Sequence, residues 1–343
     1  MNIVHTEITP MPSPQPLRLV HAYQQWPMRK VFRISRSASE WSPVHVVHVT
    51  DGVHIGRGEC GELPYAGDTP QSVEAGILEI AASLNDCGTP ERLHAAFPAS
   101  SARNAVDAAL WDLACKRQGR SIWDLTGVAH RPSLEIDFTI GIADLDEMCR
   151  SAAALREQGY REIKIKVDAR DVVATVSAIA AAAPGAKFIV DANEAWSFEQ
   201  LQDVAPRLST LGVVLIEQPL HRDADHALEG WKSPVALFAD ESCDTCDDIA
   251  RLAPRYDGFN IKLDKCGGLT EALAIVRAAR ARGKGLMVGC AGATSLGLAP
   301  AYVVGTLCDH RDLDSAGMHF DDRTAGMAYE HGEIRSFTSA LWG

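Results

Sequence analysis

Short apolar runs alternate with helix-length segments from about residue 133 onward. The runs are rich in Val and Ile, and each has the length of a strand. Runs that are apolar throughout are typical of parallel strands buried on both faces. The pattern predicts an α/β barrel of repeated strand and helix units, with strands at SLEIDFTIGI, EIKIKV, KFIVDAN, VVLIEQP, VALFADES, GFNIKL, GLMVGC and a weak eighth near LCDHRDLD.

The region before this barrel has a different pattern. Residues 1–16 contain four prolines and are expected to form a flexible extension. Residues 17–128 are predicted to form an α+β capping domain. Its strands are expected in LRLVHAY, VFRISR and VHVVHVTDGVHIGRGEC, the last broken by a hairpin turn at Asp51-Gly52, and its helices in QSVEAGILEIAASL and ARNAVDAALWDLACKR. The barrel is placed at 129–316, and the segment 317–343 is expected to return to the capping domain.

Three successive apolar runs each end in a lone acid. These acids are Asp191, Glu217 and Asp240. The carboxyl ends of barrel strands converge on one face, so the three side chains can meet there. A set of carboxylates without His or Cys suits Mg²⁺, or Mn²⁺, better than Zn²⁺. A single acid at such a place is often only a cap of the next helix, but three in series favour a metal site.

Lysines end two strands that flank the acids. Lys164 and Lys166 alternate to the same side of the strand EIKIKV, and Lys262 lies in GFNIKL. The two groups would face each other across the barrel mouth, which suits removing a proton from one face of a carbon and returning one to the other. Burial and nearby positive charge lower the pKa of a lysine, so that it can act as a base. Lys265, just beyond the strand, is expected to be a surface side chain.

The motifs KIK, DAN, EQP, DES and NIKLDKCGGL together resemble the muconate-lactonizing subgroup of the enolase superfamily. SARNAVDAALWDLACKRQG, VGCAGATSL and the late DLD are similar to the dipeptide epimerases of L-Ala-D/L-Glu type. The resemblance extends from about residue 17 to the C-terminus. It implies a (β/α)7β modified TIM barrel with an α+β capping domain, and an isomerase of cell-wall (murein) peptide metabolism.

The resemblance also implies roles for individual residues. In this family Asp312 and Asp314 of the DLD motif bind the free amino group of the dipeptide, where two carboxylates can pair with a positive charge. Arg36 matches a position whose guanidinium holds the side-chain carboxylate of a glutamyl residue. If Asp312 and Asp314 did not bind an amino group, the DLD motif would be an ordinary solvated turn.

These residues define an expected mechanism. Mg²⁺, held by the three acids, binds the C-terminal carboxylate of the substrate, and Lys164 adds positive charge to it. Lys166 and Lys262 exchange the α-proton on opposite faces through an enediolate. Three further residues complete the prediction: Asn193 and Gln218 orient the ligands, and Thr139 touches the substrate.

Three alternatives stay open at this point. The enzyme could epimerise other dipeptides, or it could be a muconate cycloisomerase or an o-succinylbenzoate synthase of the same fold. The DLD acids count against the last two, whose substrates have no amino group. A metal-binding protein without turnover is the third alternative, and the complete set of bases and ligands counts against it.

Composition adds limits to this interpretation. The formal net charge of the 343 residues is −12, which argues against a nucleic-acid surface. No apolar run reaches membrane-spanning length, and no signal sequence is evident, so a cytoplasmic enzyme is expected. Its expected partner is a small-molecule dipeptide substrate, and assembly into a homo-oligomer is an open possibility. The nine cysteines should be reduced thiols, and neither the pair Cys243 and Cys246 nor the loop residues His221 and His226 are expected to have a role.

Overall fold

Eight parallel strands form the barrel sheet in the computed structural model, which describes residues 16–35 and 37–343. Each strand pairs with the next one along the chain, in the order β5 to β12. The strands are β5 Asp137–Ile140, β6 Glu162–Lys166, β7 Lys187–Asp191, β8 Val213–Glu217, β9 Ala236–Ala239, β10 Gly258–Lys262, β11 Gly285–Gly289 and β12 His310–Arg311. The predicted α/β barrel class is confirmed.

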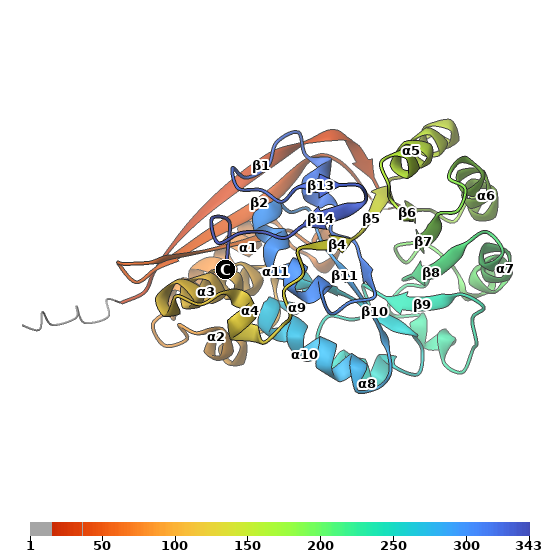
Figure 1. The fold of residues 1–343 in the computed structure, drawn as a ribbon. Coiled ribbons are helices and arrows are strands. Elements are labelled where there is room, and N and C mark those ends of the chain that lie inside the picture. Colours follow the sequence, from red (N-terminus) through yellow and green to blue (C-terminus); the bar gives the residue numbers. More distant parts are fainter. Residues whose placement is uncertain (1–15, 36) are drawn as a thin grey trace, which may run out of the picture.

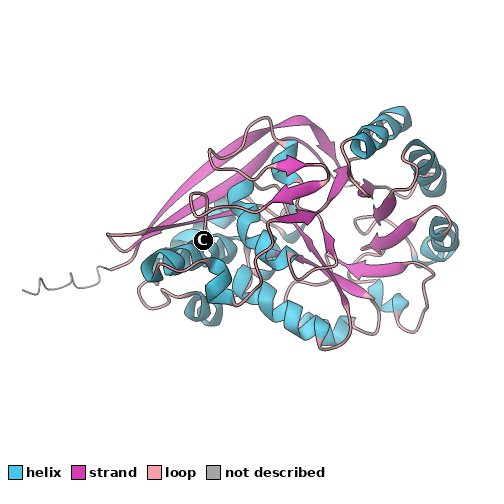
Figure 2. Cartoon of the chain, in the orientation of Figure 1, coloured by secondary structure: helices cyan, strands magenta, loops and turns pink. Residues whose placement is uncertain are grey.

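Helices cover the outside of these strands, as Figures 1 and 2 show most plainly for the first three. Between β8 and β9 a 3-10 turn, η2, takes the place of a helix, and a second turn, η3, follows β12. The helices are α5 Leu145–Glu157, α6 Val172–Ala182, α7 Phe198–Ser209, α8 Asp248–Leu252, α9 Leu263–Cys266, α10 Leu269–Arg280 and α11 Ser295–Gly305, and the turns are η2 Asp225–Leu228 and η3 Ser315–Met318.

An apolar layer fills the barrel below the strand ends. It is a separate buried cluster of Ile189, Leu215, Phe238 and Met287. Because side chains alternate along a strand, Ile189 and Leu215 lie on the same face of the sheet as the acids two residues later. The ring of Phe238 lies against Gly258 and Gly285, where a Cβ atom would come within 2.6 Å of it. This layer places the polar groups above it at one end of the barrel.

The capping domain contains an antiparallel sheet and helices. Its elements are β1 Arg18–Arg33, β2 Ala38–Thr50, β3 Ile55–Gly61, η1 Pro64–Ala66, α1 Pro70–Ala82, α2 Pro90–Ala96, α3 Ser101–Gln118 and α4 Ile122–Thr126. The predicted hairpin turn after β2 is present, with Gly52 at φ 88°. The prediction of separate strands in LRLVHAY and VFRISR is wrong: residues 18–23 and 31–33 belong to one strand, β1, because pairing with the long β2 resumes after a register shift between Pro27 and Phe32.

The C-terminal segment contacts both parts of the molecule. Strands β13 Tyr329–Glu330 and β14 Glu333–Arg335 pair with β4 Ser133–Glu135, which precedes the barrel. Further on, the indole of Trp342 donates to the carbonyl of Ala108 in α3 at 3.0 Å. The predicted boundaries of the four segments stay predictions.

Charged groups join the cap to the barrel at one buried point. Glu59 of β3, which is fully buried, accepts from the backbone N–H of Thr294 at 2.7 Å and from the Arg323 guanidinium at 2.5 Å. Thr294 caps the N-terminus of α11, so this acid connects the cap to a barrel helix and to the C-terminal segment.

Two of the compositional expectations can be compared with the fold. Within the described residues, no helix has both the length and the apolar character to cross a bilayer. All nine cysteines fall in the described part, and each is free, as predicted.

Candidate active site

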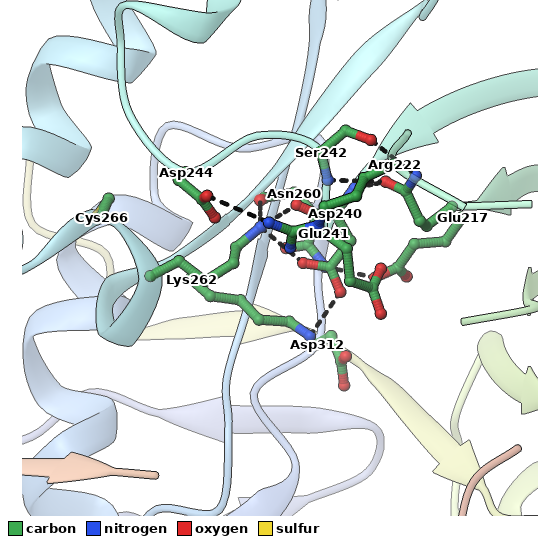
Figure 3. Close-up of polar contacts among 12 residues, drawn as sticks. Glu217, Arg222, Asp240, Glu241, Ser242, Asp244, Asn260, Lys262, Cys266 and Asp312 are labelled. Carbon is green, nitrogen blue, oxygen red and sulfur yellow. Dashed lines mark hydrogen bonds and ion pairs between the residues drawn. The ribbon is translucent and has the colours of Figure 1, made fainter. Parts of the chain in front are cut away.

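The three predicted acids lie side by side at the carboxyl ends of adjacent strands. Asp191 and Glu217 end β7 and β8 and are directly paired in the sheet, and Asp240 follows β9. All three are fully buried, although a carboxylate is costly to bury without a partner. Figure 3 shows Glu217 and Asp240 close to Lys262 and Asp312.

Lysine ammonium groups pair with this row of acids. The Nζ atom of Lys164 lies 3.1 Å from Asp191 Oδ2 and 2.7 Å from Glu217 Oε2. At one end of the row, Lys166 Nζ lies 2.5 Å from Asp191 Oδ2. At the other end, Lys262 Nζ lies 2.7 Å from Asp240 Oδ2. The acids therefore stand between two lysines that come from β6 and β10.

Charge pairing shifts the ionisation of these groups in different directions. Burial opposes the charge of Asp191, but Lys166 and Lys164 outweigh it and lower the pKa to about 2. Likewise, Lys262 and Lys265 overcome burial and hold the pKa of Asp240 well below its usual value. For Glu217, burial and the neighbouring Asp191 dominate, and the pKa rises to about 7.

Lys265 is part of the site, so its prediction as a surface side chain is wrong. It is 5 % exposed, and its Nζ atom lies 2.7 Å from Asp240 Oδ1 while also donating to the Asp240 carbonyl. The short helix α9 turns the chain back after β10, which brings Lys265 under Asp240 and away from solvent. Asn260, another residue missed from the sequence, donates to Glu217 Oε1 at 2.7 Å.

The two predicted orienting residues lie in strained loop positions directly behind the acids. The Gln218 side-chain oxygen accepts from the backbone N–H groups of Asp240 and Ser242, at 2.9 and 3.1 Å. The Asn193 backbone N–H donates to Asp191 Oδ1 at 2.9 Å. Both residues have a positive φ, 34° for Gln218 and 43° for Asn193, which is uncommon outside glycine. Each therefore fixes the position of one acid of the row.

The DLD acids are buried at the seam between β12 and β5. Asp314 Oδ2 accepts from the Thr139 backbone N–H at 2.6 Å, and Asp312 Oδ1 accepts from the Thr139 hydroxyl at 3.3 Å. Asp312 Oδ2 also lies 2.7 Å from Lys164 Nζ. The DLD motif is thus no solvated turn, and it joins the acid row through Lys164. Arg36 lies outside the described residues.

Carboxylates form two distinct groups in the described part of the chain. Asp137, Asp312 and Asp314 each place one oxygen within 4.8 Å of the other two. In the row of Asp191, Glu217 and Asp240, the ammonium group of Lys164 contacts the first two acids, and two further lysines contact the ends of the row. Metal ligands must be deprotonated, and in the row the pKa is lowered for two acids, Asp191 and Asp240, and raised for Glu217. In the other group it is lowered for Asp312 alone and raised for Asp137 and Asp314. The row is therefore the better fit for a divalent cation.

The cap reaches over this end of the barrel. Tyr65 in η1 lies under the guanidinium of Arg222, which is 5.9 Å from its ring centroid, and Arg222 belongs to the loop after β8. Burial and the charge of Asp240 raise the pKa of Tyr65. This loop of the cap is thus close enough to the acid row to affect what binds there.

A cavity of about 620 Å³ lies beside the barrel rather than at the acids. Its lining includes Phe32 of β1, Met148 of α5 and Tyr160. Thr139 is the predicted site residue that also lines it. Charged side chains, among them Lys30, Glu147 and Arg150, line this cavity together with the apolar groups, whereas Asp191, Glu217 and Asp240 do not line it.

Comparisons with known proteins agree with this architecture. Residues 18–127 match the mandelate racemase / muconate lactonizing enzyme N-terminal domain, and residues 147–336 match the enolase C-terminal domain-like family. The L-Ala-D/L-Glu epimerase of Escherichia coli (strain K12) is 38 % identical over 93 % of this chain and 99 % of the relative. The chain belongs to the dipeptide epimerase family of the enolase superfamily. It is an isomerase of the epimerase and racemase type.

Other proteins similar to this chain differ in the ligand or substrate that their descriptions name. An enolase family member from Agrobacterium tumefaciens, described as having homology to dipeptide epimerases and solved with sodium and L-Ala-L-Glu, has a TM-score of 0.92, 36 % identity, and coverage of 96 % of this chain and 100 % of its own. A dipeptide epimerase from Cytophaga hutchinsonii, solved with Mg and D-Ala-L-Val, has a TM-score of 0.88 at 25 % identity and covers 94 % of each chain. An N-acetyl-D-glutamate racemase from Pseudoalteromonas sp is 36 % identical over 87 % of this chain and 94 % of its own.

The remaining residues considered from the sequence lie outside the site. His221 and His226 are exposed in the loop after β8, as expected. Cys243 is buried and Cys246 is half-buried, and burial raises the pKa of both thiols, which opposes thiolate chemistry.

Proposed function

We propose that this enzyme epimerises dipeptides at the residue that carries the C-terminal carboxylate, with L-Ala-D/L-Glu as the first pair to test. Support comes from the relatives that act on such dipeptides and from the buried DLD acids. A cytoplasmic role in cell-wall peptide metabolism is the setting that this substrate suggests.

The acid row is the proposed binding site of Mg²⁺, with Mn²⁺ as a functional substitute. Asp191, Glu217 and Asp240 offer only carboxylate oxygens, and all three are shielded from water. When bound, the cation would stabilise the negative charge that collects on the substrate carboxylate as the α-proton leaves. The structures of relatives with Mg and a dipeptide support this choice of metal.

The positions of the lysines carry the proposal. Lys166 contacts the acid row at Asp191 and Lys262 contacts it at Asp240, so a carbon held above the row has an amine on either side. One lysine, in its neutral form, removes the α-proton, and the other, in its ammonium form, delivers a proton to the opposite face. The centre is thereby inverted, and the reverse reaction uses the lysines in the opposite order.

Lys164 has a different proposed role, which follows from its contacts. It is fully buried and lies within 3.1 Å of two acids of the row and of Asp312. Acidic neighbours overcome the effect of burial and raise its pKa well above the usual value, so it stays charged. Against the effect of burial, Asp240 raises the pKa of Lys262 in the same direction, an effect that a divalent cation bound to Asp240 would weaken. The contacts of Lys164 with three acids are therefore what distinguishes it, and its proposed role is to supply fixed positive charge next to the substrate carboxylate.

Asp312 and Asp314 are the proposed partners of the substrate amino group. Their burial makes an unpaired carboxylate costly, so a substrate ammonium gains a strong charge-assisted bond there. The relative that racemises N-acetyl-D-glutamate makes an N-acylated amino acid the second candidate substrate. An acylated nitrogen carries no positive charge, and the two acids therefore favour the free amine of a dipeptide.

Hydrogen exchange in D₂O tests the two lysines separately. With Lys166→Ala or Lys262→Ala we expect epimerisation of L-Ala-L-Glu to fall at least about a thousandfold, the upper range of a lost acid–base group. Each variant should still exchange the α-proton of one epimer, and the two variants should retain opposite epimers. Lys232→Ala, which changes an exposed lysine away from the site, is the control. Equal exchange of both epimers in either variant would exclude two opposed bases.

A further inference from the structure

Asp137 is a buried carboxyl group that the proposed reaction does not yet use. It lies on β5 two residues before Thr139, so alternation points both side chains into the barrel. The residue is 1 % exposed, and neither of its carboxyl oxygens has a hydrogen-bond partner. Buried polar groups normally form hydrogen bonds, so two buried carboxyl oxygens without a partner indicate that Asp137 binds a ligand.

The unpaired group points at the two DLD acids. One oxygen each of Asp137, Asp312 and Asp314 lies within 4.8 Å of the others. Three atoms that all lie within 4.8 Å of one another form a triangle with a central point no more than about 2.8 Å from each, which is within the usual length of a charge-assisted N–H···O bond. A nitrogen at the centre could therefore bond to all three residues.

Neighbouring groups hold two of the three acids, Asp312 and Asp314, in place. Thr139 donates its backbone N–H to Asp314 and its hydroxyl to Asp312, and Lys164 lies 2.7 Å from Asp312. Asp137 has no such support, and it faces two acids with Lys164 as the nearby cation. Another positive charge inside the triangle would relieve this repulsion.

We propose that Asp137 is the third carboxyl group of a pocket for the primary ammonium of the substrate. A primary ammonium has three N–H donors, and the triangle offers one acceptor from each residue. This inference rests on the proposed function, since it extends the amino-binding role of Asp312 and Asp314. It explains how the site would favour a free N-terminus over an acylated one, because an amide nitrogen has neither the charge nor the donors to satisfy three acids.

The test compares Asp137→Asn with two ligands that differ only at the amino group. Binding of L-Ala-L-Glu and of N-propionyl-L-Glu, which lacks the ammonium, is measured by calorimetry with the Mg²⁺-loaded enzyme. We expect the variant to bind the dipeptide about ten- to a hundredfold more weakly, as for a lost bond to a charged group, and the propionyl analogue within about twofold of the wild type. Asp314→Asn should give the same selective loss.

Thermal unfolding without ligand separates this role from a structural one. Removing an unpaired buried carboxyl group should leave the melting temperature unchanged or raised, whereas losing a structural bond would lower it. Asp107→Asn is the matched control, because Asp107 is equally buried but accepts a hydrogen bond from the Thr270 hydroxyl at 2.5 Å. If the isosteric variant does not fold, Asp137→Ser is measured in its place.

The outcomes divide clearly between the two proposals. If Asp137→Asn binds both ligands equally more weakly, the role of Asp137 is overturned. The same holds if Asp137→Asn binds the dipeptide as the wild type does while Asp314→Asn binds it more weakly. Tight dipeptide binding by the wild type without any turnover would contradict the proposed epimerisation, and the selective effect of Asp137→Asn would still be measured.

Discussion

Replacing Lys265 by Met removes a buried cation that the sequence alone had suggested was at the surface. Its ammonium contacts Asp240 Oδ1 at 2.7 Å and the Asp240 carbonyl, and it lies 3.3 Å from the Asn260 carbonyl. Methionine has a similar length and no charge, so the main change is the loss of these donors. Breaking a buried ion pair from one side costs about 3–5 kcal/mol.

The low end of that range applies, because Lys262 still pairs with the other oxygen of Asp240. Unfolding entropy near 60 °C is about 2.1 cal/mol/K per residue, which for 343 residues gives about 0.7 kcal/mol/K. A loss of about 3 kcal/mol therefore lowers the melting temperature by about 4 °C.

Scanning calorimetry of the metal-free protein measures this shift. Lys232→Met, which removes the charge of an exposed lysine, should change the melting temperature by less than about 1 °C, as surface substitutions usually do. If Lys265→Met also stays within that limit, then the ion pair with Asp240 contributes no stability and the reasoning is refuted.

Three further predictions concern charge and metal. Chelation with EDTA should abolish epimerisation, and Mg²⁺ or Mn²⁺ should restore it, as measured by the rate of epimer formation. The raised pKa of Glu217, about 7 against a usual 4.5, means that the folded state holds this proton more tightly, so its contribution is complete below pH 4.5 and is lost as the pH rises through 7. Metal-free Glu217→Gln should therefore show a smaller fall in melting temperature between pH 5 and 7 than the wild type. Asp312→Asn should raise the KM of L-Ala-L-Glu at least about tenfold, since a charge-assisted bond is lost, while leaving Mg²⁺ affinity within about threefold.

The barrel and its row of acids could be predicted because both depend on local pattern. An acid such as Asp191 at the end of a short apolar run is visible in the sequence, and parallel strands bring such ends together. The lysines of β6 followed from alternation in the same way. The position of these lysines beside the acids could then be expected without knowing any distance.

Residues that depend on chain reversals were missed. Lys265 lies three residues beyond β10, where the sequence reads as a polar strand end, and only the turn of α9 brings it under Asp240. Asp137 lies at the start of its strand, and its partners are 175 and 177 residues further along the chain in the DLD motif. No local pattern signals such a contact.

The two strands predicted in residues 17–36 failed for a related reason. Polar residues and Pro27 between them resemble a loop, but β2 is long enough to pair with residues 18–27 and, after a register shift, with residues 32–33. Tertiary pairing thus overrides a local signal that favours a break.

Proton NMR of L-Ala-L-Glu with the wild-type enzyme and Mg²⁺ in D₂O tests the central claim most directly. The account predicts that the Glu α-proton signal disappears and that the signals of L-Ala-D-Glu grow, with no change when Mg²⁺ is withheld. An α-proton signal that persists across a panel of dipeptides, together with Mg²⁺-dependent turnover of a cycloisomerase or o-succinylbenzoate synthase substrate, would contradict it.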